Sequence, residues 1–214
     1  MEFHLSRNST STVVLSSTPL RSSSASTTTL VDALPVYHIY SPGQLTRNTT
    51  YISHISSDIA VKPEHKFKSA RKGDIKDAAS YGEGGVVEFA RLNWRTFRST
   101  RLVYNMQITD LDQFLTGSDL IGSARTFVGP DGLSYSWHMG MTTSLLTLKA
   151  AVPAETAPKT IAKFYPQSAV GAGRNPYLEV QPEGMHMLDI IVITWVFVET
   201  RRRELEKQYP AFPI

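Results

Sequence analysis

The sequence contains no cysteine, and its charged residues are scarce. The absence of cysteine excludes disulfide bonds, thiolate zinc sites and cysteine nucleophiles. Charged residues make up 19% of the 214 residues, below the roughly 25% of an average soluble protein. Lysine and arginine exceed aspartate and glutamate by 22 to 19, a net charge of +3. That excess is too small to indicate nucleic-acid binding without a local basic patch.

Signals for secretion and for crossing a membrane are also missing. A secretory signal needs an apolar run of about 7–15 residues, and the first part of the chain offers only residues 13–15. The longest apolar run, 187–198, would extend about 18 Å as a helix, short of a ~30 Å hydrocarbon layer. Asp189 also interrupts this run. We therefore expect an intracellular, cytoplasmic protein, and a tail-anchored membrane protein is the alternative.

Serine and threonine are concentrated near the start of the chain, where they occupy 15 of the 24 positions from 6 to 29. Such a segment lacks the apolar surface that would offset the entropy of ordering it. We predict a disordered arm over residues 1–29, open to phosphorylation. One domain over 30–208 and a short tail over 209–214 follow it.

From residue 30 the pattern is that of short strands separated by turns. The clearest hairpin has Pro130, Asp131 and Gly132 between two apolar runs, because proline presets one turn position and glycine supplies a positive φ at another. A long polar segment over 57–84 is predicted to be a surface loop. Strands are predicted at 28–31, 36–40, 49–55, 86–94, 100–104, 125–128, 133–137, 145–149, 160–165 and 177–180, with a short helix or edge segment at 111–115.

One long apolar segment follows the strands. No proline or glycine interrupts residues 190–208, a length common for helices and long for strands. Asp189 near the start and the basic residues 201–203 near the end suit a helix dipole. The apolar part has no polar face, so protein must surround it. We predict an α+β, mainly β fold, an antiparallel β-barrel closed around a buried hydrophobic C-terminal helix.

Four stretches together are similar to a known family. They are residues 35–42, 89–94, 127–137 and 182–199. In their order and spacing they resemble a fungal family, domain of unknown function 6593, which is distantly similar to tubby C-terminal domains, phospholipid scramblases and LURP-one-related proteins. The resemblance implies a tubby-like barrel with the C-terminal helix threaded through it. It implies no catalytic residues, and the tubby lipid-contact residues have no counterpart here.

No catalytic, nucleotide-binding or metal-binding motif is complete in the sequence. We therefore expect no enzyme activity, no cofactor and no metal. His38 and His54 lie on neighbouring predicted strands, and Asp189 lies at the helix start. Together they would serve a pocket at a barrel mouth, as an enzyme or a small-ligand carrier requires. The alternatives are packing for the histidines and helix capping for Asp189.

Two basic stretches carry the leading functional hypothesis, a non-catalytic module that binds an anionic phospholipid surface or a protein. A cation near an anionic membrane contributes ~1 kcal/mol, and peripheral membrane association would follow. Nucleic acid is not expected, because aromatic residues do not alternate with the cations of the loop. The alternative is a solvated loop and an ordinary barrel exterior. The candidate binding residues are Lys62, Lys66, Lys68, Arg71, Lys72, Lys76, Arg91, Arg95, Arg98 and Arg101.

Overall fold

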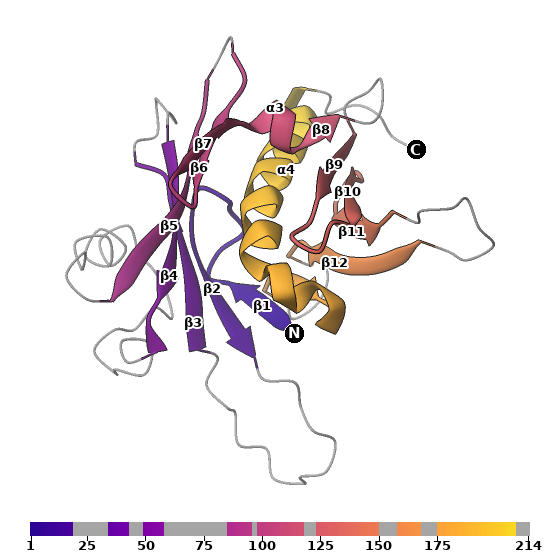
Figure 1. The fold of residues 1–214 in the computed structure, drawn as a ribbon. Helices are drawn as coiled ribbons and strands as arrows, with labels where there is room; N and C mark the ends of the chain where they lie inside the picture. The colour runs from indigo at the N-terminus through magenta and orange to yellow at the C-terminus, as the bar shows by residue number, and fades with distance from the viewer. Residues whose placement is uncertain are drawn as a thin grey trace, which may run out of the picture.

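The computed structural model describes residues 1–18, 34–42, 49–57, 85–95, 98–117, 123–149, 158–167 and 175–208. These residues form one antiparallel sheet and a long C-terminal helix, α4, that lies between the two halves of the sheet (Figure 1). The strands are β1 (Glu2–Leu5), β2 (Thr12–Thr18), β3 (Leu34–Tyr40), β4 (Thr49–Ile55), β5 (Val86–Asn93), β6 (Arg101–Tyr104), β7 (Gln107–Asp110), β8 (Thr116–Gly117), β9 (Ala124–Val128), β10 (Ser134–Met139), β11 (Ser144–Leu148), β12 (Lys159–Tyr165) and β13 (Tyr177–Val180). The helices are α3 (Leu111–Phe114), the 3-10 helix η2 (Pro182–Met187) and α4 (Leu188–Gln208).

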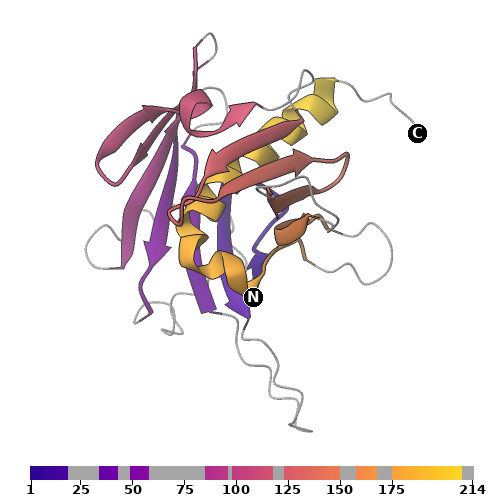
Figure 2. The same ribbon diagram turned by 45° about the vertical axis from the view of Figure 1, so that its right-hand side comes forward.

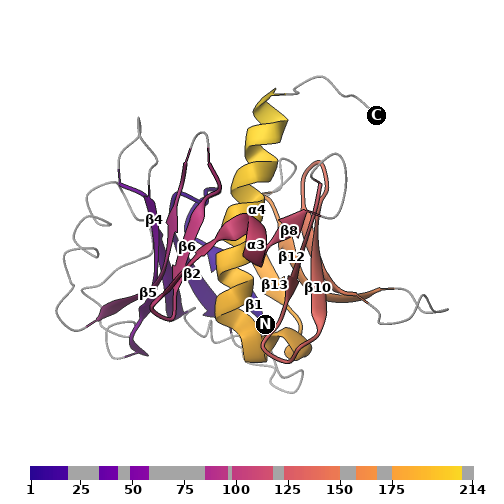
Figure 3. The same cartoon turned by 45° about the horizontal axis from the view of Figure 1, so that its top comes forward.

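The strand order of the sheet follows the chain within each half. It is β7-β6-β5-β4-β3-β2-β1-β13-β12-β11-β10-β9-β8, so β1 joins the halves by pairing with both β2 and β13. Figures 2 and 3 show strands on either side of α4. In the described part of the chain, the edge strands β7 and β8 do not pair, and α3 connects them. The sheet is therefore open, and the predicted closed barrel is not confirmed.

The middle of helix α4 is buried, as its apolar sequence predicts. Every residue from Ile191 to Thr200 is buried, and the ring of Trp195 lies 5.4 Å from that of Phe164 on β12. Trp137 of β10 donates its indole N–H to the Thr194 hydroxyl over 2.9 Å, which satisfies a buried donor. Among the described residues, no helix is long and apolar enough to cross a membrane.

The hairpin predicted around residues 130–132 is confirmed as the β9–β10 hairpin. Gly132 has a φ of +78°, a conformation that glycine adopts without steric cost. At Gly129, a Cβ would lie 2.7 Å from the Tyr135 ring. Both glycines are therefore required by local geometry, the first by its φ and the second by space.

The prediction of a disordered arm is wrong for the first 18 residues, and residues 19–29 lie outside the described residues. Strands β1 and β2 occupy the middle of the sheet, and Phe3, Val13 and Leu15 are at most 1% exposed. The reason is non-local pairing: β1 gains its second partner from β13, for example Phe3 opposite Leu178. Two short apolar runs therefore bury against residues that are distant in sequence, which composition alone does not reveal.

Smaller differences concern the edges of the sheet. Residues 111–114 form a short helix, which decides between the two predicted alternatives. Strands β7 and β8 were not predicted. The β6–β7 turn places both Asn105 and Met106 at positive φ, 50° and 59°, as a type I′ turn requires. The predicted strand at 28–31, the predicted loop over 57–84 from residue 58 onward, and the tail over 209–214 lie outside the described residues.

Candidate functional site

The turns of the sheet lie at two opposite ends of α4, because neighbouring strands run antiparallel. We name the first the helix-start end. It holds η2, the first turn of α4, and the β6–β7 and β9–β10 turns. We name the other the pocket end. It holds the last turns of α4, the β1–β2 connection and the β10–β11 turn.

At the helix-start end, Asp189 joins α4 to two strands. Its Oδ1 accepts a 2.7 Å hydrogen bond from the Tyr37 hydroxyl and lies 2.8 Å from Nε2 of His54. The His54 ring stacks on Phe89, with centroids 4.1 Å apart. Burial alone would raise the pKa of Asp189, but the hydrogen bonds from His54 and Tyr37 outweigh it and lower that pKa. Burial and the bond to Asp189 raise the pKa of Tyr37.

The structure thus brings together one predicted pair, Asp189 and His54, but not His38. His38 lies between the inward-facing Tyr37 and Ile39 and points to the opposite side of the sheet. It stacks on Tyr40, and burial lowers its pKa to about 4. His38 is therefore a buried neutral residue, the packing role that was the alternative.

A second contact of the same composition fastens the β9–β10 turn to η2. Asp131 Oδ2 accepts a 2.6 Å hydrogen bond from the Tyr135 hydroxyl and lies 3.3 Å from His186 Nε2. The hydrogen bond from Tyr135 lowers the pKa of Asp131. Among the described residues, no group of three or more histidine and acidic side chains could hold a metal ion. The two contacts hold the helix start against both halves of the sheet.

Large apolar side chains are exposed around these contacts. They lie on turns or on strand ends, and their exposed fractions run from 41% for Leu34 to 100% for Met106. Val87 is paired with His54 of β4, and Met106 lies in the turn between β6 and β7. In the described chain, Met141 and Leu205 are the exposed large apolar residues of the pocket end. Those of the helix-start end are Leu34, Val87, Met106, Ile108, Val128 and Leu133.

At the pocket end, a polar pocket of about 490 Å³ lies beside the last turns of α4. Segments from both ends of the chain form it: Asn8–Ser11 from the β1–β2 connection, Thr142 from the β10–β11 turn, Pro166 and Gln167 after β12, and Thr200, Arg202, Arg203, Glu204, Glu206 and Lys207 from α4. Asp189, His38 and His54 do not line it, so the predicted pocket residues are not those of this pocket.

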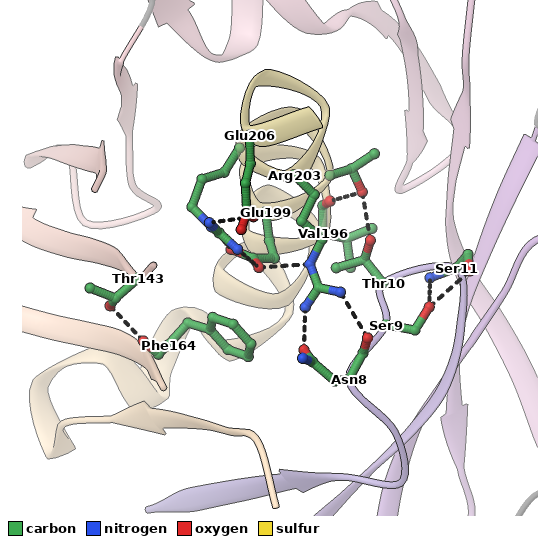
Figure 4. Close-up of polar contacts among 12 residues, drawn as sticks. Asn8, Ser9, Thr10, Ser11, Thr143, Phe164, Val196, Glu199, Arg203 and Glu206 are labelled. Atoms are coloured by element: carbon green, nitrogen blue, oxygen red, sulfur yellow. Dashed lines mark hydrogen bonds and ion pairs between the residues drawn. The ribbon is translucent and has the colours of Figure 1, made fainter. Parts of the chain in front are cut away.

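A buried carboxylate organises the wall of this pocket. Glu199 is 0% exposed. Its Oε1 accepts from Arg202 Nη2 and Arg203 Nε, each at 2.8 Å, and its Oε2 accepts from Arg202 Nε. Burial opposes the charge of Arg202, but its bonds to Glu199 raise its pKa. Figure 4 shows Arg203 continuing from Glu199 to Asn8, and Thr10 bonded to α4 beside it.

The structure describes four of the predicted basic residues, and two of these are in ion pairs. Arg91 pairs with Glu88 at 2.9 Å and lies over the Tyr51 ring, and Arg101 pairs with Asp110 at 3.6 Å. Arg95 and Arg98 lie in the β5–β6 connection, at the pocket end. The lysines and the arginine of the first stretch, residues 62–76, lie outside the described residues. That stretch connects β4 to β5, whose paired ends Ile55 and Val86 lie at the helix-start end.

Comparison with known proteins places the chain in a family. A family model described as a family of unknown function, DUF6593, matches residues 22–204. The chain belongs to this family. No curated protein and no solved structure matches it.

In this DUF6593 chain, sequence reasoning missed the pocket and its buried ion pairs. Its lining comes from four places in the chain, and only folding brings them together. One signal was present: Glu199 directly follows the apolar run of α4 and precedes three arginines. A carboxylate at the end of a buried helix needs a partner, and the arginines one turn further along were available.

Proposed function

We propose that this chain is a non-catalytic module that binds an anionic phospholipid surface through its helix-start end. The observation that carries the proposal is the exposure of six large apolar side chains at this end, with Met106 fully exposed. Side chains on turns can enter the interfacial layer of a bilayer, where each buried CH₂ group contributes ~0.8 kcal/mol. The concentration of six such side chains at one end, against two at the pocket end, supports an interaction site there.

The turn conformation of Met106 supports this role. At a φ of 59° the backbone of a glycine or asparagine would be less strained than that of a methionine, because only these residues adopt the left-handed region routinely. The fully exposed methionine has no packing role in the fold that would account for it. We therefore infer that this side chain serves an interaction and not the stability of the fold. A lipid interface is a suitable environment for its thioether group.

Charge favours the same end. Strand β4 ends and β5 begins at this end, and the basic stretch from Lys62 to Lys76 lies between them in the sequence. Cations would provide the second of the two signals that stable peripheral binding needs. Four carboxylates of this end are paired in the described part of the chain: Asp189 with His54, Asp131 with His186, Glu183 with Lys159 and Glu88 with Arg91. These carboxylates would therefore cause little electrostatic repulsion from an anionic surface.

Vesicle flotation tests the apolar part. Wild-type protein is expected to float with vesicles of phosphatidylcholine and phosphatidylserine, and less with phosphatidylcholine alone or at high salt. Met106→Gly relaxes the turn and removes the apolar side chain, so folding stability is kept while vesicle affinity falls about tenfold. The matched control is Met141→Gly, an exposed methionine at the pocket end, which should float like wild type.

Charge reversal tests the orientation. Lys66→Glu with Lys68→Glu is expected to weaken flotation at low salt, because each cation contributes ~1 kcal/mol. Arg95→Glu with Arg98→Glu, at the pocket end, should have little effect. If the second pair abolishes flotation and the first does not, the proposed orientation is wrong. If wild type floats with neither kind of vesicle, the lipid is excluded and a protein partner at the same end is favoured.

A tubby-like barrel remains part of this proposal. Its support is the buried C-terminal helix between the two halves of one antiparallel sheet. An experimental structure in which β7 and β8 close the sheet would establish it, and one in which their edges stay apart would exclude it.

A further inference from the structure

The pocket at the pocket end is open on one side, and hydrogen bonds hold two of its walls together. Arg203 donates from Nη1 to the Asn8 carbonyl oxygen at 2.8 Å and from Nη2 to Asn8 Oδ1 at 2.6 Å. Thr10 and Thr200 share a buried 2.8 Å hydrogen bond. These contacts hold the β1–β2 connection against α4 (Figure 4). A ligand would therefore bind to a preformed surface, and the entropic cost of ordering that surface on binding would be small.

Most of the lining residues carry hydrogen-bonding side chains, although apolar atoms form about half of the pocket surface. Pro166 is its one apolar residue, and hydroxyl groups from both chain ends line it. Thr142 and Gln167 make no side-chain hydrogen bond to any described residue, so their hydroxyl and amide groups are available. Hydroxyls and amides both donate and accept, which suits a ligand that carries several hydroxyl groups. An apolar ligand would leave these groups unpaired at a cost.

When the ion pairs around the pocket are counted, one of its cationic side chains has no acidic partner. Arg202 and Arg203 bind Glu199, and Arg202 also reaches Glu206 at 3.2 Å. Glu204 pairs with Arg201. Lys207 has no acidic partner among the described residues. Its ammonium is the group that can meet a negative charge on a ligand without first breaking an ion pair.

We infer that this pocket binds a small polyhydroxylated anion, a sugar that carries one carboxylate or one phosphate group. Lys207 meets the anionic group, and Thr142, Gln167 and the Ser9 and Ser11 hydroxyls meet the sugar hydroxyls. A volume of about 490 Å³ lies within the range of small-molecule sites, ~300–1,000 Å³. The pocket lies at the opposite end of α4 from the proposed membrane surface, so the inference does not depend on that proposal.

Isothermal titration calorimetry on the full chain tests the ligand class. The probes are D-gluconate, D-glucose 6-phosphate, D-glucose and inorganic phosphate. Binding of either anionic sugar, at least tenfold tighter than that of glucose and of inorganic phosphate, supports the inference and identifies the anionic group. Equal binding of inorganic phosphate would overturn it by showing an anion site that does not recognise hydroxyls. Absence of binding by both anionic sugars would also overturn it.

Two variants locate the site. Lys207→Gln should weaken the binding of the anionic sugar about tenfold, as expected for one charged contact, and leave the binding of glucose unchanged. Thr142→Val should weaken the binding of both sugars. The matched control is Lys149→Gln, an exposed lysine at the helix-start end without an ion pair among the described residues, and it should bind like wild type. If Lys207→Gln binds as wild type while its unfolding is unchanged, the assignment is wrong.

Discussion

Arg203 near the end of α4 is hydrogen-bonded to Asn8 near the start of the chain, through both the Asn8 side chain and its carbonyl oxygen. The same guanidinium also binds the buried Glu199. One side chain therefore links the β1–β2 connection, the helix and the ion-pair network behind the pocket. The position of residues 8–11 depends on this link, since their contacts to α4 run through Arg203 and Thr200.

Removing the Glu199 carboxylate is expected to be costly. Glu199→Gln leaves two guanidinium groups without their buried anion, and breaking a buried pair in this way costs about 3–5 kcal/mol. Urea unfolding of the variant measures the loss. Glu204→Gln, which affects an exposed pair with Arg201, is the control and should cost less than about 1 kcal/mol. Similar losses of unfolding free energy in the two variants would show that the buried ion pairs of Glu199 stabilise the fold no more than an exposed pair does.

Burial of His38 predicts a loss of stability in mild acid. The unfolded chain protonates this imidazole below its ordinary pKa near 6.5, whereas the folded chain does not until about pH 4. The unfolded state therefore binds more protons, and stability falls as the pH drops from about 6.5 to about 4, by about 3 kcal/mol in total. Urea unfolding of wild type and His38→Gln at several pH values measures this. A variant with the same slope as wild type would contradict the assignment.

The Asp189 contact predicts a second pH dependence, in more acidic solution. The pKa of Asp189 is lowered in the folded state, so its stabilising effect is present above the unfolded pKa and is lost as the pH falls through the folded pKa. Asp189→Asn should be less stable than wild type at neutral pH and should show a weaker loss in acid. Tyr37→Phe, which removes one of the two donors, should have an intermediate effect in the same titration.

The β9–β10 turn offers a comparison of two glycines. Gly129→Ala places a Cβ 2.7 Å from the Tyr135 ring, and overpacking of this kind costs about 1–3 kcal/mol. Gly132→Ala meets open space but holds alanine at a positive φ, at a cost of about 1–2 kcal/mol. Thermal unfolding measures both. Because Tyr135 binds Asp131, only Gly129→Ala should also disturb the contact with His186, visible in the NMR shifts of that imidazole.

The sequence by itself determined the elements whose signal is local. Proline and glycine around Asp131 specify the β9–β10 hairpin, and the uninterrupted run from Ile190 onward specifies a helix that protein must enclose. Both follow from the preferences of neighbouring residues. The tertiary structure decided what depends on distant pairing. Phe3 and Leu5 look like part of a polar arm until Leu178 and Pro176 lie beside them.

The sites divide in the same way. Asp189, His38 and His54 were candidates from sequence, because Asp189 begins the helix and the two histidines lie on neighbouring predicted strands. The pocket was not a candidate, because Asn8, Thr142 and Arg203 come together only when the β1–β2 connection and the β10–β11 turn meet the end of α4. The conformational preferences of residues adjacent in sequence determine a strand or a turn. A pocket depends on which surfaces are buried together, and burial is a property of the whole chain.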